Sequence, residues 1–189
     1  MTHPADTLRE IKDLDVMTHK IGEYFTSFTG IELTACDFLH ARRLTLKGKI
    51  HRPSSLRKDK EQGVYVFIVD YRHCLKVGYS GPKSQSRWNT QHYTLNTSVS
   101  STLTKSILNY SPTFTKFLED TDIDTATIRE FVDILNDAAK YAWYDPRIRE
   151  WLETYTSRME FKFSADESKF AGTFLESSLH YLLHPLYEG

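Results

Sequence analysis

The sequence lacks several features that would assign a protein to a broad class at once. Its 189 residues include two cysteines, Cys36 and Cys74, and no Cys-x-x-Cys pair, so we expect reduced thiols rather than a disulfide framework or a zinc site. The longest continuous apolar run, residues 64–69, is much too short to cross a bilayer. The first twenty residues contain no apolar stretch of signal-peptide length. We therefore expect a cytoplasmic protein with no membrane contact.

The chain also lacks a net charge of either sign. Lys and Arg together number 24, and Asp and Glu number 25, which gives a formal charge of −1. This balance argues against a protein that coats nucleic acid by bulk charge, although it leaves room for a local basic groove. Hydrophobic residues make up 40% of the chain and aromatic residues 13%, enough for a substantial core, so wholesale disorder is excluded.

Residues 1–60 are predicted to form a helical leader that ends in a basic arm. Apolar residues recur at three- and four-residue spacing over residues 8–21, which is typical of an amphipathic helix. A second short helix is expected at about residues 35–43. Residues 42–60 then contain eight basic residues and only one acid. This stretch is either a solvated loop or an arm that contacts phosphates. The candidate nucleic-acid contacts in this arm are Arg52, Arg57 and Lys58.

The main domain is expected at residues 61–189. A strand at residues 64–69 carries β-branched and aromatic residues on both faces, which indicates cover on both sides. Two further strands are expected at residues 74–79 and about 159–163, with an acidic helical insertion at about residues 111–158 and a last helix after residue 167. The predicted fold class is α+β, with a small antiparallel or mixed sheet of about three strands flanked by helices.

One group of residues in this domain has the chemistry of a catalytic site. Tyr65 lies on the first of these strands, Lys76 and Tyr79 lie on the second, and Arg87 follows. If the two strands pair, an ammonium comes close to the phenol and lowers its pKa, while the arginine suits a phosphate. The alternative is structural: Tyr65 is one more strand aromatic in a core and Lys76 a surface residue. Periodicity alone favours this alternative.

The order of these residues resembles the GIY-YIG nuclease superfamily, over a stretch from about Gln62 to the C-terminus. The stretch after Arg87 is more similar to the restriction-endonuclease branch than to the DNA-repair branch. Each motif alone is weak, whereas their order and spacing together are specific. The motifs are Gly63-Val64-Tyr65, Lys76-Val77-Gly78, Arg87, Glu176 and Pro185.

The resemblance implies a role for each matched residue. Tyr65 would be the general base that takes a proton from the attacking water, and Arg87 would neutralise charge on the phosphoryl oxygens. Lys76 stands where many members have a second tyrosine, and its cation would support the Tyr65 phenolate. Glu176 would hold the metal ion, Mg²⁺ or Mn²⁺. Tyr79 and His92 are weaker candidates for phosphate contacts or for supporting the catalytic residues.

Two departures from the family pattern are visible. Glu188 stands near the position where the family often has an asparagine, which puts that residue's hydrogen-bonding role in doubt. More residues separate Arg87 from Glu176 in the sequence than in the minimal family core, and the acidic insertion accounts for the difference. An acidic insertion should avoid DNA, so we expect it on the far side of the domain or in a protein contact.

The function implied by the resemblance is a divalent-metal-dependent endonuclease that hydrolyses DNA phosphodiester bonds, in restriction or defence against foreign DNA. Its partners would be DNA and, through the acidic helical insertion, a second copy of the chain or another protein. Two alternatives stay open. The chain could be a catalytically inactive nucleic-acid-binding accessory protein on the same scaffold, or a nuclease that acts on RNA or branched DNA.

Overall fold

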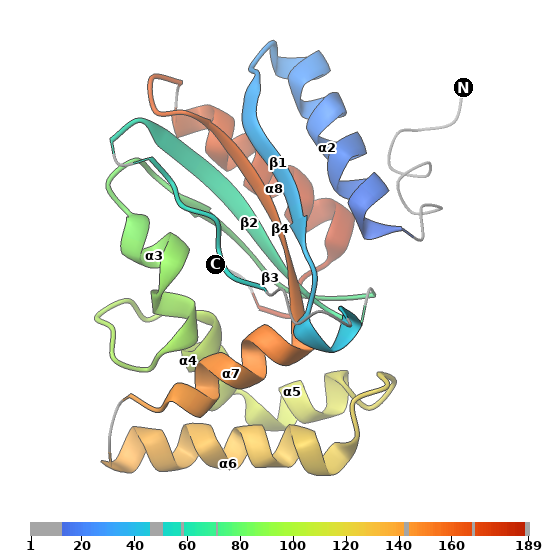
Figure 1. Ribbon diagram of the computed structural model, residues 1–189, viewed down its shortest axis with the longest axis vertical. Helices are drawn as coiled ribbons and strands as arrows, with labels where there is room; N and C mark the ends of the chain where they lie inside the picture. The colour runs from blue at the N-terminus through green and yellow to red at the C-terminus, as the bar shows by residue number, and fades with distance from the viewer. Residues whose placement is uncertain are drawn as a thin grey trace.

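A four-stranded antiparallel sheet forms the centre of the molecule, in the strand order β1-β4-β2-β3 (Figure 1). The computed structural model describes residues 13–45, 51–57, 59–70, 72–141, 144–167 and 169–187. The strands are β1 (Leu33–Leu39), β2 (Glu61–Val69), β3 (His73–Ser80) and β4 (Thr156–Ser164). The α+β class is confirmed, and the sheet has four strands rather than the three expected.

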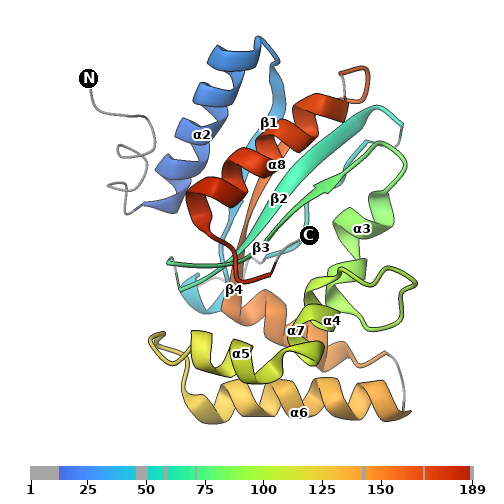
Figure 2. The same ribbon diagram turned by 180° about the vertical axis from the view of Figure 1, so that it is seen from behind.

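Helices cover both faces of this sheet. Figure 2 shows α8 (Lys169–Leu183) lying across one face, with α2 (Leu14–Thr29) beside it. The other face meets a helical layer formed by the segments between β3 and β4. The members of this layer are α3 (Gln85–Asn89), η2 (Gln91–Tyr93), α4 (Leu103–Asn109), α5 (Ser111–Phe117), α6 (Thr125–Tyr141) and α7 (Pro146–Tyr155).

Strand β2 is buried along its whole length, as its sequence indicated. Val64, Val66 and Ile68 pack with α2 and α8, whereas Tyr65 and Phe67 point to the opposite face and pack with the helical layer. Because successive side chains of a strand alternate between its faces, a strand covered on both sides needs apolar residues at every position. This alternation places Tyr65 between the sheet and α3.

The prediction of a helix at about residues 35–43 is wrong. Residues 33–39 form β1, which pairs with β4 through contacts such as Phe38 with Met159, and the 3-10 turn η1 (Arg42–Leu44) follows. The apolar spacing of this short segment fits a helix and a strand almost equally well. The free edge of β4 decides the outcome, because tertiary pairing overrides a weak local propensity.

Helices α5, α6 and α7 lie within residues 111–158, the range expected for the insertion. Asp145 caps α7 by accepting a hydrogen bond from the Arg147 backbone N–H, and Pro146 occupies the first turn. The rings of Phe131 in α6 and Trp151 in α7 stack with centroids 4.1 Å apart, so the two helices share one core with the sheet. Within the described ranges, no helix is both long and apolar enough to cross a bilayer.

The chain after α8 returns to the edge of the sheet. The backbone N–H groups of Leu186 and Tyr187 donate to the carbonyls of Cys74 and Leu75, at 2.9 and 3.0 Å. Tyr187 also forms a parallel bridge with Lys76. These contacts cover the first half of the outer edge of β3 and leave its second half, around Tyr79, to α8.

The Phe131–Trp151 stack predicts where the helical layer is most sensitive to substitution. Phe131→Ala should lower the free energy of unfolding by about 3–5 kcal/mol, because it removes a fully buried ring and leaves a cavity. Tyr141→Ala, on the same helix but 82% exposed, is the matched control and should change stability by less than about 0.5 kcal/mol. Urea denaturation measures both. Equal losses would show that the stack does not hold the layer.

Candidate active site

The hydroxyl of Tyr65 accepts two hydrogen bonds. The Arg87 side chain donates from Nε at 3.2 Å, and His92 lies with its Nε2 atom 2.6 Å from the same oxygen. Arg87 comes from α3 and His92 from η2, the two short elements that follow β3. The structure therefore brings the predicted phenol, the predicted arginine and the weaker candidate His92 to one point.

The hydrogen bonds of His92 determine its protonation state. The Leu103 backbone N–H donates to His92 Nδ1 at 3.0 Å, so the ring proton must reside on Nε2, which then donates to the Tyr65 oxygen. Complete burial, together with the positive charges of Arg158, Lys76 and Arg87, lowers the pKa of His92 well below its ordinary value. His92 is thus a neutral donor to Tyr65.

Two opposing effects act on the phenol itself. Burial raises the pKa of Tyr65 above its ordinary value, and the Arg87 and Arg158 guanidiniums act in the opposite direction. Burial is the larger effect, so the folded structure keeps the Tyr65 phenol protonated near neutral pH. The two donors on its oxygen nevertheless favour the phenolate once the proton leaves.

Lys76 lies on β3 with its side chain fully buried on the same face of the sheet as Tyr65. Burial and the neighbouring Arg87 lower the pKa of Lys76 to about 8, against the opposing effect of Glu176. An ammonium with this pKa exchanges its proton readily near neutral pH. The predicted second cation therefore lies within electrostatic reach of both Arg87 and Glu176.

Glu176 reaches this cluster from the opposite face of the sheet. Since β3 is an edge strand, the Tyr79 backbone N–H points away from the sheet, and it donates to Glu176 Oε1 at 2.9 Å. Glu176 is half-buried, and its charge raises the pKa values of both Tyr65 and Lys76. Its carboxylate therefore lies at the rim of the sheet, beside the buried phenol and ammonium.

The side chain of Tyr79 lies on the face of the sheet opposite Tyr65. It packs on the face that carries α8, where its hydroxyl donates to Gln62 Oε1. A Cβ atom on Gly172 of α8 would lie 2.6 Å from Tyr79 Cδ2, so the helix needs glycine there to approach the strand. Tyr79 thus acts on the cluster by holding α8, and with it Glu176, against β3.

The candidate nucleic-acid-binding residues of the basic arm lie in different surroundings. Arg57 forms an ion pair with Glu61, with its Nε atom 2.9 Å from Oε1, which offsets its charge locally. Arg52 is exposed and lies beside Arg42 and Arg149, in a hollow apart from the cluster around Tyr65. Lys58 and Glu188 lie outside the described residues.

Two buried charges beside Tyr65 were not predicted from the sequence. Glu160 is the cross-strand partner of Tyr65 on β4, and Arg158 is the partner of Phe67. Both side chains are fully buried, with Arg158 Nε 2.9 Å from Glu160 Oε1, and the Arg158 guanidinium lies 4.8 Å from the Tyr65 ring centre. The signal was present, because opposite charges two residues apart share one face of a strand. This spacing indicates a buried ion pair only when helices cover both faces of the sheet, which the sequence of β4 does not show.

A metal ion at this site would depend on Glu176. Across the part of the chain that the structure describes, no three His, Cys, Asp or Glu side chains gather closely enough to hold a metal ion. Mg²⁺ is commonly held by one or two carboxylates, with waters and substrate phosphates completing its shell. A carboxylate with one oxygen bound to an N–H and a half-buried position at the sheet edge fits that requirement.

Comparisons of the chain with protein-family models, with curated proteins and with solved structures find no match. Any functional assignment therefore depends on the order of the residues in the sequence and on the geometry described above. That geometry joins Tyr65, Lys76, Arg87, His92 and Glu176 through hydrogen bonds and mutual electrostatic effects.

The glycine opposite Tyr65 is required by the ring itself. A Cβ atom on Gly78 would lie 2.6 Å from Tyr65 Cζ, so Gly78→Ala must displace the phenol. We expect a loss of about 1–3 kcal/mol in unfolding free energy, which is typical of overpacking. Gly81→Ala is the matched control, because its Cβ would meet its nearest neighbour at an ordinary 3.5 Å. Equal stability of the two variants in urea would contradict the packing described here.

A second buried histidine predicts how stability depends on pH. His51 donates from Nδ1 to the Thr156 carbonyl at 2.6 Å and accepts from the Tyr93 hydroxyl at 2.8 Å. Burial, with the nearby Arg158, lowers the pKa of His51 to about 3. The unfolded chain binds this proton more readily, so the contribution of His51 to stability is complete above its unfolded pKa and declines as the pH falls.

We expect acidification from about pH 7 to about pH 5 to cost roughly 2 kcal/mol through His51 alone. His51→Gln should show a correspondingly smaller loss of unfolding free energy over the same range, whatever its stability at neutral pH. His19→Gln, at an exposed position, is the control and should behave like the parent protein. Parallel curves for His51→Gln and the parent protein would contradict a neutral buried histidine.

Proposed function

We propose that the protein is a divalent-metal-dependent endonuclease that hydrolyses DNA phosphodiester bonds, of the GIY-YIG type. The observation that carries this proposal is the Tyr65 hydroxyl, which accepts hydrogen bonds from Arg87 and from a neutral His92. A buried tyrosine hydroxyl usually finds a hydrogen-bond partner. Two donors on its oxygen, with a carboxylate within electrostatic reach, support a proton-accepting role.

The chemistry follows from the charges around that oxygen. Tyr65 first releases its own proton to solvent, when substrate binding exposes the phenol, and the phenolate then takes a proton from the attacking water. Arg87, His92 and the underlying Arg158 stabilise the negative charge of the phenolate. Arg87 and Lys76 offset the charge that develops on the phosphoryl oxygens. Glu176 would hold the divalent ion, whose positive charge would stabilise the leaving oxygen. Tyr79 and Gly172 position Glu176 by bringing α8 close to β3.

The biological setting is proposed from the resemblance to restriction enzymes, namely cleavage of foreign DNA. Incubation of the protein with modified and unmodified DNA, followed by mapping of the cut ends, addresses it directly. Cutting both strands from a single site per chain calls for a dimer or for two encounters. The exposed acidic residues of α6 offer a surface for a protein contact rather than for DNA; they are Glu130, Asp133 and Asp137.

A specific observation favours a second candidate, the inactive nucleic-acid-binding protein. Tyr65 and Lys76 are both fully buried, and burial holds the phenol in its protonated form. An enzyme with this structure must expose the phenol when it binds its substrate, whereas a binding protein has no such need. Binding of DNA without any EDTA-sensitive nicking would select this candidate.

Tyr65→Phe and Glu176→Gln should each slow cleavage by about 10²- to 10⁴-fold, because each removes a group that acts on the reacting atoms. The assay is nicking and linearisation of plasmid DNA in Mg²⁺ or Mn²⁺, with EDTA as the blank and thermal unfolding as a check of the fold. Tyr110→Phe and Glu119→Gln, at exposed positions, are the matched controls and should cut like the parent protein. Parent-level cutting by Tyr65→Phe would refute the mechanism.

A further inference from the structure

A hollow of about 530 Å³ lies beside the first half of α7, apart from the cluster around Tyr65. Three arginines line it from three separate segments: Arg42 from η1, Arg52 from the arm before β2, and Arg149 from α7. Tyr144 and Pro146 complete one wall. Arginines that are distant in the sequence and converge on one hollow indicate a site for an anion.

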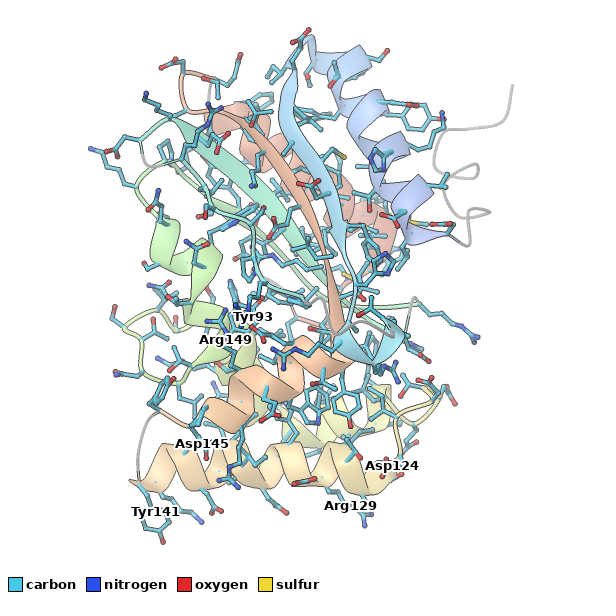
Figure 3. The ribbon with its side chains drawn as sticks, viewed as in Figure 1. Tyr93, Asp124, Arg129, Tyr141, Asp145 and Arg149 are labelled. Carbon is cyan, nitrogen blue, oxygen red and sulfur yellow. The ribbon has the colours of Figure 1, made fainter. Side chains whose placement is uncertain are left out.

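A buried carboxylate holds two of these arginines in place. The Glu153 side chain is 4% exposed, and its two oxygens are shared between Arg149 Nε, at 2.7 Å, and Arg42 Nη2, at 2.6 Å. The Arg149 guanidinium also lies over the Tyr93 ring, 5.0 Å from its centre, as Figure 3 shows for the two labelled residues. Both guanidiniums are therefore fixed while several of their N–H donors remain for a ligand, so binding loses little conformational entropy.

The charges of the lining favour an oxyanion. Three guanidiniums outnumber the two carboxylates, Glu150 and Glu153, and Glu153 is already satisfied by its two arginine partners. Planar forked donors match the oxygens of a phosphate or a carboxylate group.

The arm that carries Arg52 connects this hollow with the cluster around Tyr65. Ser54, two residues further along, donates to Glu160 from its backbone N–H at 3.2 Å and from its hydroxyl. Glu160 is the cross-strand partner of Tyr65, so the arm crosses the sheet on the face toward which Tyr65 points. A polyanion that reaches Tyr65 therefore has a second basic site a short distance along the same face.

We infer that this hollow binds a backbone phosphate in the flank of the nucleic acid whose scissile bond lies at Tyr65. The inference rests on the proposed function for its choice of ligand, because a phosphate on a continuous strand can occupy both places at once. Contacts of this kind position a nucleic acid and do not read its bases. Arg52 supplies the exposed cation of the site, and Glu150 weakens binding by repulsion.

The test is the salt dependence of binding to a fluorescently labelled DNA duplex. Fluorescence anisotropy measures the binding, and EDTA is present so that no cleavage occurs. Arg52→Gln should reduce the slope of log K against log salt by about 0.9, the change expected for one lost phosphate contact. Glu150→Gln, at an exposed position, should tighten binding. The matched controls are Arg129→Gln and Glu130→Gln on α6, and Figure 3 shows Arg129 on the outer side of that helix.

A mononucleotide and inorganic phosphate serve as competing probes for a free-ligand site. Loss of mononucleotide binding in Arg52→Gln, with duplex binding unchanged, would assign the hollow to a free nucleotide and overturn the inference. Identical salt slopes for Arg52→Gln and Arg129→Gln would overturn it as well. If the slope falls as expected but the parent protein never cuts DNA in Mg²⁺ or Mn²⁺, the nuclease proposal fails while the phosphate site stands.

Discussion

The ion pair between Arg158 and Glu160 is buried between the sheet and the helical layer, and neighbouring segments supply part of its hydrogen bonding. Ser54 donates to Glu160, while Arg158 donates to the Trp88 carbonyl at 3.0 Å and lies against three aromatic rings. Removing one partner of such a pair costs about 3–5 kcal/mol, because an uncompensated charge stays buried. The arm before β2 and helix α3 are thus bound to β4 by polar contacts as well as by apolar packing.

This buried charge also influences the protonation of its neighbours. Burial, with the Arg158 guanidinium as the next contribution, lowers the pKa values of His51 and His92, and both rings are neutral in the folded chain. A neutral His92 that accepts from Leu103 can only donate to the Tyr65 oxygen. The arginine on β4 therefore acts on the phenol directly through its charge, and indirectly by adding to the burial that keeps His92 neutral.

The helices between β3 and β4 contribute to the site rather than forming a separate appendage. Helix α4 supplies the Leu103 N–H that orients His92, and α7 supplies the arginine that joins Arg42 and Arg52 in the hollow. The acidic residues of α6 are exposed, and Figure 1 shows this helix on the side of the layer away from the sheet. One insertion therefore carries both a basic surface near the sheet and an acidic surface away from it.

The sequence alone determined the features that depend on neighbours in the chain. The doubly covered strand β2, the Asp145-Pro146 start of α7 and the order of Tyr65, Lys76, Arg87 and Glu176 were all visible in it, because periodicity, capping and motif spacing are local. The strand β1, the donors on Tyr65 and the convergence of Arg42, Arg52 and Arg149 were decided by the tertiary structure. These features arise from pairing and burial between segments that are distant in the sequence, and no local pattern encodes which segments will meet.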